Sequence, residues 1–149
     1  MADLNWRQQV IADWEAAEDV VNAALVAAGL APLSKWIKGE PRPYPQTGGP
    51  LLWWDWPDEG ADEVSEVLDN QREQVAMLAV LLIEAPDVAT LMDREAEYLP
   101  VVIAALERHE WTYQTTYRGG GRLTNPRGMV AWRPMAFQIE ADRLIGDVR

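Results

Sequence analysis

Apolar residues recur every three or four positions through residues 4–28 and form one continuous stripe. Its members are Trp6, Val10, Trp14, Ala17, Val21, Leu25 and Ala28. This period matches one face of an α-helix, so the stripe predicts an amphipathic helix with both of its tryptophans in the core. Asp3 or Asn5 can cap the start of the helix, and Gly29 followed by Pro32 ends it.

Proline and glycine interrupt the segment 30–57 too often for a helix, which leaves room only for short extended pieces. Within it, Leu51–Trp56 predicts a strand, because aromatic residues favour strands and turn residues flank it. Alternation along a strand sends Trp53 and Trp54 to opposite faces. At least one large ring therefore points away from the local core, unless a second layer covers it.

Residues 58–73 are acidic and weakly patterned, and we expect a loop there with room for one short helix. The segment 74–85 then holds the apolar block Val75–Ile83, which fits either a strand buried on both faces or part of a helix. The strand is favoured, because Pro86 and Asp87 end the block abruptly and start a helix.

A second helical stripe follows from Val88 to about Arg108, with Asp87 placed as its N-cap. Its members are Leu91, Met92, Glu95, Tyr98, Leu99, Val102, Ile103 and Leu106. Pro100 lies inside the pattern, so we expect it to kink the helix or split it in two.

Residues 111–117 and 129–142 alternate in polarity and predict an antiparallel hairpin. Pro134 places a bulge or an edge in its second strand, and a long, glycine-rich, basic loop forms its tip. The strand, helix and hairpin span 74–142. The whole chain, residues 1–149, is thus predicted to be a single α+β domain, with a mostly antiparallel sheet and two main helices packed on one face.

The charge of the chain is concentrated in one place. The formal net charge is −11, and between Asp55 and Glu73 eight acidic residues stand against one base, Arg72. Such a segment does not bind nucleic acid non-specifically, because phosphate binding needs Lys and Arg. It is either a solvated segment that favours solubility or the wall of a passage through which DNA moves without sticking.

Composition excludes several classes of protein. Hydrophobic residues make up 48% of the chain, so disorder over most of its length is not expected. The longest apolar run, Val75–Ile83, is too short to span a bilayer, and we expect neither a membrane segment nor a secretory signal. Without cysteine there are no disulfides and no thiolate zinc site.

The residue types that carry catalysis are missing or isolated. The single histidine, His109, stands beside Glu110 at a helix end, where we expect a solvated residue rather than a base. Gly119–Gly121 opens no phosphate-binding motif. Asp55–Glu66 partly matches a calcium loop, but Pro57 stands where a ligand is needed. We therefore predict no enzyme, no catalytic residue, no metal and no cofactor.

Tryptophan is unusually frequent, with eight in the chain and three of them nearly adjacent. Because Trp is enriched at interfaces, that cluster is a candidate contact surface. Three arginines on the hairpin tip are a second candidate. The predicted interface residues are Trp53, Trp54, Trp56, Arg118, Arg122 and Arg127.

The order of these segments resembles that of the tail terminator proteins of long-tailed (siphovirus-type) bacteriophages, over nearly the whole chain. The segments that carry the likeness are Pro41–Trp56, Val80–Asp87, Val88–Arg108, Trp111–Tyr117 and Met135–Asp142. The likeness rests on pattern and order, since there is no invariant motif to match. A composition rich in Ala, Val, Asp and Arg, with few Lys and no Cys, suggests a phage of an actinobacterial host.

The resemblance implies a structural virion protein that forms a hexameric ring. The ring would cap the tail tube, dock on the head-side connector protein and let DNA pass through its channel without specific binding. It implies a place at the head–tail junction of a particle assembled in the host cytoplasm. On this basis, the tip arginines reach the acidic segment of a neighbouring subunit, or else form a solvated hairpin tip.

Two alternatives remain. The first is another head–tail connector, stopper or tail-completion protein of the same particle. The second is a small acidic inhibitor or immunity-type protein, which would use the acids of 55–73 to bind one basic partner. Oligomeric state separates the second from the others, because an immunity protein would be a monomer or a dimer.

Overall fold

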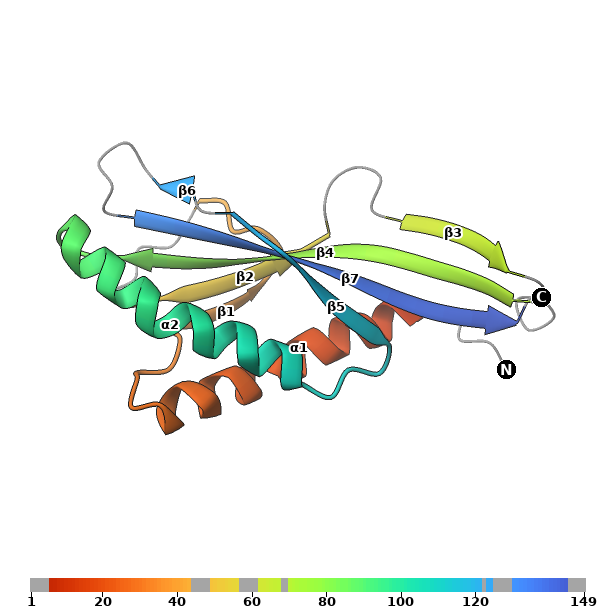
Figure 1. The fold of residues 1–149 in the computed structure, drawn as a ribbon, viewed down its shortest axis with the longest axis horizontal. Helices are drawn as coiled ribbons and strands as arrows, with labels where there is room; N and C mark the ends of the chain where they lie inside the picture. Colours follow the sequence, from red (N-terminus) through yellow and green to blue (C-terminus); the bar gives the residue numbers. More distant parts are fainter. Residues whose placement is uncertain are drawn as a thin grey trace.

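The computed structural model describes the chain in six ranges: 6–43, 49–56, 62–67, 70–121, 123–124 and 130–144. Helices and strands follow one another as α1 (Trp6–Ala27), β1 (Lys35–Lys38), β2 (Leu51–Asp55), β3 (Asp62–Val67), β4 (Asn70–Glu84), α2 (Val88–Arg108), β5 (Gln114–Gly119), β6 (Leu123–Thr124) and β7 (Val130–Leu144). Figure 1 shows this order in sequence colours.

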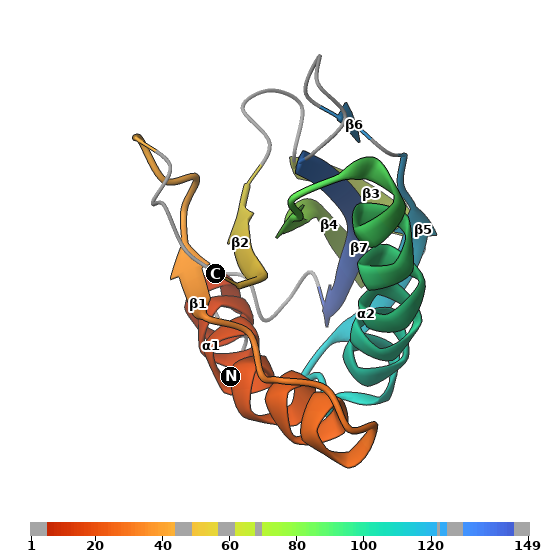
Figure 2. The ribbon, with the colours of Figure 1, turned by 90° about the vertical axis from the view of Figure 1, so that its left-hand side faces the viewer.

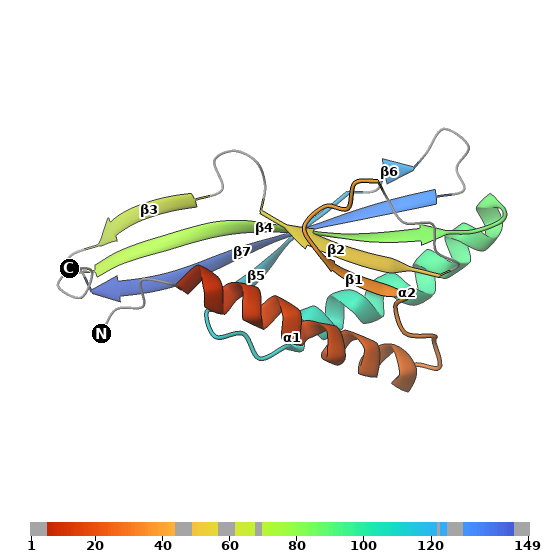
Figure 3. The ribbon, with the colours of Figure 1, turned by 180° about the vertical axis from the view of Figure 1, so that it is seen from behind.

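All of these strands belong to one sheet, with the order β1-β2-β4-β7-β5, while β3 pairs with β4 and β6 pairs with β7. The β1–β2 pair is parallel and every other pair is antiparallel. Both helices lie on the same side of the sheet (Figures 2 and 3). The predicted α+β class and the mostly antiparallel sheet are therefore confirmed.

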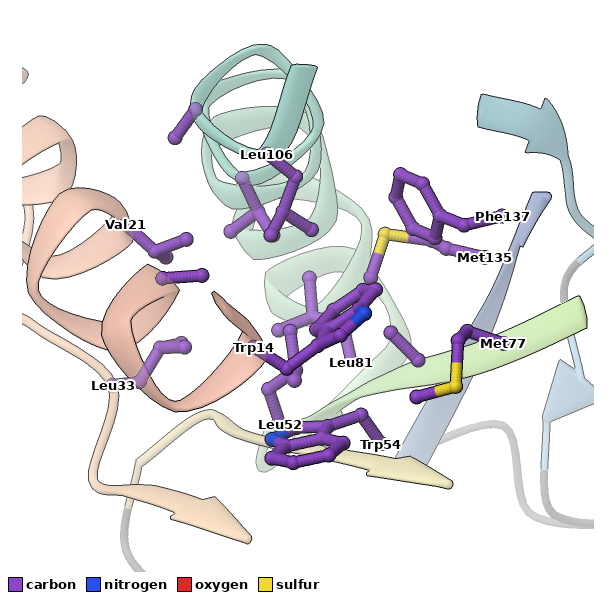
Figure 4. Close-up of a cluster of buried hydrophobic side chains, with 14 of the residues drawn as sticks. Trp14, Val21, Leu33, Leu52, Trp54, Met77, Leu81, Leu106, Met135 and Phe137 are labelled. Atoms are coloured by element: carbon purple, nitrogen blue, oxygen red, sulfur yellow. The ribbon is translucent and has the colours of Figure 1, made fainter. Parts of the chain in front are cut away.

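The first helix buries its predicted stripe as far as Leu25, whereas Ala28 lies beyond the end of α1 and is exposed. The buried residues of α1 are Trp6, Val10, Asp13, Trp14, Ala17, Val21 and Leu25. Trp14 is fully buried at the centre of the core, where its ring stacks on Trp54 at 5.8 Å and meets Phe137 edge-on at 5.3 Å. Figure 4 shows these rings between the helices and the sheet. Two distant parts of the chain, β2 and β7, are thus fixed against α1.

The second helix begins and ends where its pattern predicts. Asp87 caps it, accepting a hydrogen bond of 2.7 Å from the backbone N–H of Thr90. The expected split at Pro100 does not occur, because α2 continues as one helix through that residue. Pro100 and Ala96 are both exposed, so the Ala96 carbonyl that loses its partner can be hydrated instead.

The N-cap predicts a pH effect. Hydrogen bonds from Thr90 lower the pKa of Asp87 below its ordinary value. A carboxyl whose pKa is lower in the folded state stabilises the fold above its unfolded pKa, and this contribution is lost as pH falls through the folded pKa. Asp87→Asn should therefore narrow the stability difference between pH 7 and pH 3 in denaturant titrations. Asp93→Asn, at an exposed position on the same helix, is the control, and equal pH dependence for wild type and Asp87→Asn would contradict the assignment.

The acidic segment 58–73 is the largest departure from the sequence-based prediction. Instead of a loop, it contains β3 and the beginning of β4. The β4–β7 ladder runs unbroken from Asn70 opposite Leu144 to Glu84 opposite Val130. Backbone pairing along β7 outweighs the low strand propensity of acidic residues, which depends strongly on context.

Candidate interaction surface

The tryptophans of β2 lie on opposite faces of the sheet, as alternation predicts. Trp54 belongs to the main core under the helices and is 2% exposed. Trp53 is 5% exposed and lies in a small second cluster with Leu51, Val80 and Leu82. Trp56 is half-buried against the main core. The prediction of an interface is therefore corrected for Trp53 and Trp54, whose rings are buried within the chain.

Of the predicted interface arginines, the structure places Arg118. It is exposed near the end of β5, and its Nε donates a 2.8 Å hydrogen bond to Oε1 of Gln138 on β7. Arg122 and Arg127 lie outside the described residues. Among the described residues, Arg118 thus lies on the edge strand β5, whereas Trp53 and Trp54 lie on β2 toward the other end of the strand order.

The beginning of the hairpin tip is held tightly to the sheet. Along β7, pairing with β5 reaches Ala136, and pairing with β6 begins at Trp132. Pro134 stands between them, where the pairing on that side of β7 is interrupted, while on the other side it stays opposite Val80 of β4. The backbone of Gly120 lies so close that a Cβ there would be 1.7 Å from the Pro134 carbonyl oxygen. The register of β5 against β7 also shifts between Tyr117 and Gly119, so the extra residue lies in β5 and not in the strand that holds Pro134, where a bulge was expected.

His109 is not the solvated helix-end residue that the sequence suggests. Its Nε2 lies 2.9 Å from the backbone carbonyl oxygen of Asp13 in α1, and its ring meets Trp111 edge-on at 4.5 Å. Nδ1 is buried and has no hydrogen-bond partner. The ring is thus half-buried between α1 and the end of α2, where it tethers the two helices.

Asp13 completes this tether. Its carboxylate is 8% exposed and accepts three hydrogen bonds: 2.9 Å from the backbone N–H of Thr112, 3.0 Å from the Thr112 hydroxyl and 3.1 Å from Nε2 of Gln9. The buried carboxylate is thus satisfied by neutral donors, as buried polar groups usually are. Asp13 therefore acts as a structural bracket between α1 and the segment that leads into β5.

The most distinctive feature of the sheet is an acidic arm at one end. We define the acidic arm as β3 together with residues 70–75 of β4 and 139–144 of β7. β4 and β7 have 15 residues each, a length of about 50 Å at 3.3 Å per residue. Their outer ends project beyond both helices, and β3 lies beside them (Figures 1 and 3).

The arm carries most of its charge on its edge strand. Its acidic residues are Asp62, Glu63, Glu66, Glu73, Glu140 and Asp142, and its basic residues are Arg72 and Arg143. By register, Arg72 stands opposite Asp142, so these two positions form a cross-strand pair of opposite charge. The three acids of β3 stand opposite Val75, Gln74 and Gln71, none of which is basic.

A short strand at another edge of the sheet has the opposite charge. β1 reads Lys-Trp-Ile-Lys, with both lysines exposed and the two apolar residues between them half-buried. It pairs with β2 on one side only, and Lys35 and Lys38 stand opposite Leu51 and Trp54. Trp36 anchors the strand, because its indole N–H donates to the Trp14 carbonyl at 3.1 Å. Neither lysine forms an ion pair with any residue in the described ranges.

A shallow hollow on α2 is the remaining surface feature. Its lining residues are Met92, Glu95, Ala96, Leu99, Pro100 and Arg133. At its base, Nε of Arg133 donates to Oε2 of Glu95 at 2.6 Å, and the Glu95 side chain is only 6% exposed. This ion pair fixes α2 to β7. Because the charges of Arg133 and Glu95 neutralise each other, this pair leaves neither charge unpaired for binding a ligand.

Comparison with known proteins adds no assignment. No protein-family model matches the sequence, and no curated protein matches it. Within the ranges that the structure describes, no group of three or more His, Cys, Asp or Glu side chains could hold a metal ion. None of the described helices has the length and apolar character needed to cross a membrane.

Proposed function

We propose that this protein is a structural component of a phage particle, a tail terminator whose copies assemble into a ring at the head–tail junction. The observation that supports this function best is the acidic arm, which leaves the helix-covered part of the sheet and carries a free strand edge. A compact monomer gains nothing from such an arm, because a strand edge without a partner exposes unpaired backbone groups.

The charge of the arm fits both contacts that the proposal requires. Carboxylates repel phosphate, so an arm that lines the central channel would let DNA pass without binding it. The same carboxylates attract a basic surface on a neighbouring copy. Arg118, Arg122 and Arg127 on the hairpin tip are one candidate for that surface, and charge reversal at Arg122 and Arg127 tests it.

The mass of the purified protein in solution is the direct test. Light scattering over a range of concentrations should show a species of about six times the 16.8 kDa chain mass, in equilibrium with monomer. Because exposed charges contribute to the contact, raising the salt from 0.1 M to 1 M should shift the equilibrium toward monomer, as the screening length falls from about 10 Å to about 3 Å.

A strictly monomeric protein at high concentration and low salt would contradict the ring proposal. That result would favour the acidic inhibitor or immunity-type alternative, in which the arm binds one basic partner. Capture of purified tail tube or head-connector protein at the same concentrations separates a terminator from another ring of the particle, since a terminator must bind the tube.

A further inference from the structure

We propose that the subunit contact is a strand addition: the outer edge of β3 in one copy pairs with the outer edge of β1 in the next. This inference rests on the proposed function in one respect: the strand that pairs with each edge belongs to a second copy of this chain. It assigns the contact to two particular strands and makes it directional.

The first support is that both strands are edges within the described sheet. β1 pairs only with β2, and β3 pairs only with β4, so each strand has one row of backbone N–H and C=O groups without a strand beside it. An exposed edge of this kind is a template for an extended segment of another chain. β1 has four residues and β3 has six, so β3 is long enough to pair with β1 along its whole length.

The second support is charge. β3 contains Asp62, Glu63 and Glu66 and no base, whereas β1 contains Lys35 and Lys38 and no acid. By register, none of these five residues has an oppositely charged residue directly opposite in its own sheet. A β3–β1 contact brings the two sets together, and opposite charges on neighbouring strands are favourable.

The same charges exclude the symmetric alternatives. Pairing of β3 with β3 would place acids opposite acids, and pairing of β1 with β1 would place lysines opposite lysines, which is unfavourable in both cases. The remaining contact joins two different surfaces of the same chain, so it runs head-to-tail unless two copies make it reciprocally. Repeated head-to-tail contacts generate a closed ring or an open chain of copies, so the edges favour the assembly that a terminator needs.

β1 is a better acceptor than the hairpin tip on the described geometry. Lys35 and Lys38 are exposed and unpaired within the described residues, on a strand whose backbone also has a free side. Arg118, in contrast, already donates to Gln138. Arg118 therefore offers charge from a bonded side chain, whereas β1 offers charge together with backbone pairing.

Complementary charge reversal tests the contact. One variant carries Lys35→Glu and Lys38→Glu, and the other carries Asp62→Lys, Glu63→Lys and Glu66→Lys. Each variant alone has like charges on both edges, so its self-assembly in light scattering should weaken at least about a hundredfold. Mixed in equal amounts, the two variants restore opposite charges at every contact, and assembly should return with the copies alternating. Circular dichroism and thermal unfolding confirm that each variant is folded before mixing.

Arg122→Glu with Arg127→Glu is the matched control, because it also reverses two positive charges. The inference predicts that this variant assembles within about threefold of wild type. Wild-type assembly by the Lys35→Glu, Lys38→Glu variant would overturn the inference, and so would folded variants that stay monomeric when mixed. Both results leave the ring proposal intact if wild type is oligomeric. A monomeric wild type overturns the ring proposal and this inference together.

Discussion

Gly120→Ala should destabilise the fold by about 2–3 kcal/mol, although residue 120 is exposed. The new Cβ would lie 1.7 Å from the carbonyl oxygen and 2.6 Å from the carbonyl carbon of Pro134. Both are backbone atoms, so no side-chain rotation relieves the overlap. Either the segment after β5 lifts away from β7, or β7 bends and strains its pairing with β4.

The measurement is thermal unfolding of Gly120→Ala beside Gly121→Ala. Since a Cβ at residue 121 meets no atom within 4 Å, that substitution should be nearly neutral. Both variants lose the same glycine entropy from the unfolded chain, which isolates the steric term. For a chain of this length, the loss at Gly120 corresponds to a fall in Tm of about 5–10 °C. Equal melting temperatures for the two variants would show that the tip is not pressed against Pro134.

Asp13→Ala should destabilise the protein by a similar amount, about 2–3 kcal/mol. The truncation removes the acceptor of two donors on Thr112, its backbone N–H and its hydroxyl. It also leaves a gap between α1 and the chain that enters β5. Hydrogen bonds to a charged acceptor contribute more than bonds between neutral groups, so the loss of the bonds that Asp13 accepts carries most of this cost.

Asp13→Asn is the matched substitution, because it keeps the shape and one carbonyl oxygen. That oxygen can still accept from the Thr112 N–H, and the amide can donate to the Thr112 hydroxyl. We expect Asp13→Asn to lower the free energy of unfolding, measured in urea, by at most about 1 kcal/mol. If Asn and Ala cost the same, the negative charge itself would be what stabilises the bracket, and the hydrogen-bond account would be wrong.

The helices were predictable because their signals are local. Their apolar stripes have the helical period, and the Asp87 cap stands directly before the second stripe. The hairpin of β5 and β7 was equally readable, although β5 begins at Gln114 rather than at residue 111. Each of these elements buries one face, and burial imposes a period on the sequence.

The pairing of the arm was not predictable from local patterns. β3 and the first residues of β4 contain few apolar residues, and acidic residues are rare in strands. β3 pairs with β4, which follows it closely in the chain, but β4 pairs in turn with β7, about seventy positions later. The acidic character of this stretch was therefore visible in the composition, while its pairing into strands was missed.

The tryptophan cluster failed as an interface prediction for a different reason. Alternation placed Trp53 and Trp54 correctly on two faces, but it gave no sign that Leu51, Val80 and Leu82 build a second small cluster. β1 was missed as a candidate surface because four residues between prolines and glycines are too few for a periodic signal. Its two lysines are visible in the sequence, yet only the sheet order shows that they lie on an edge.

The position of β7 has a consequence for how the protein is made. This strand lies between β4 and β5, so the middle of the sheet is supplied by residues 130–144. During synthesis on a ribosome, β4 cannot pair with β7 until about fifty further residues have been made. Such long-range pairing also forms slowly. Until then the arm lacks one of its three strands. A nascent chain thus cannot present a finished arm to completed copies, and assembly is delayed until synthesis has passed β7.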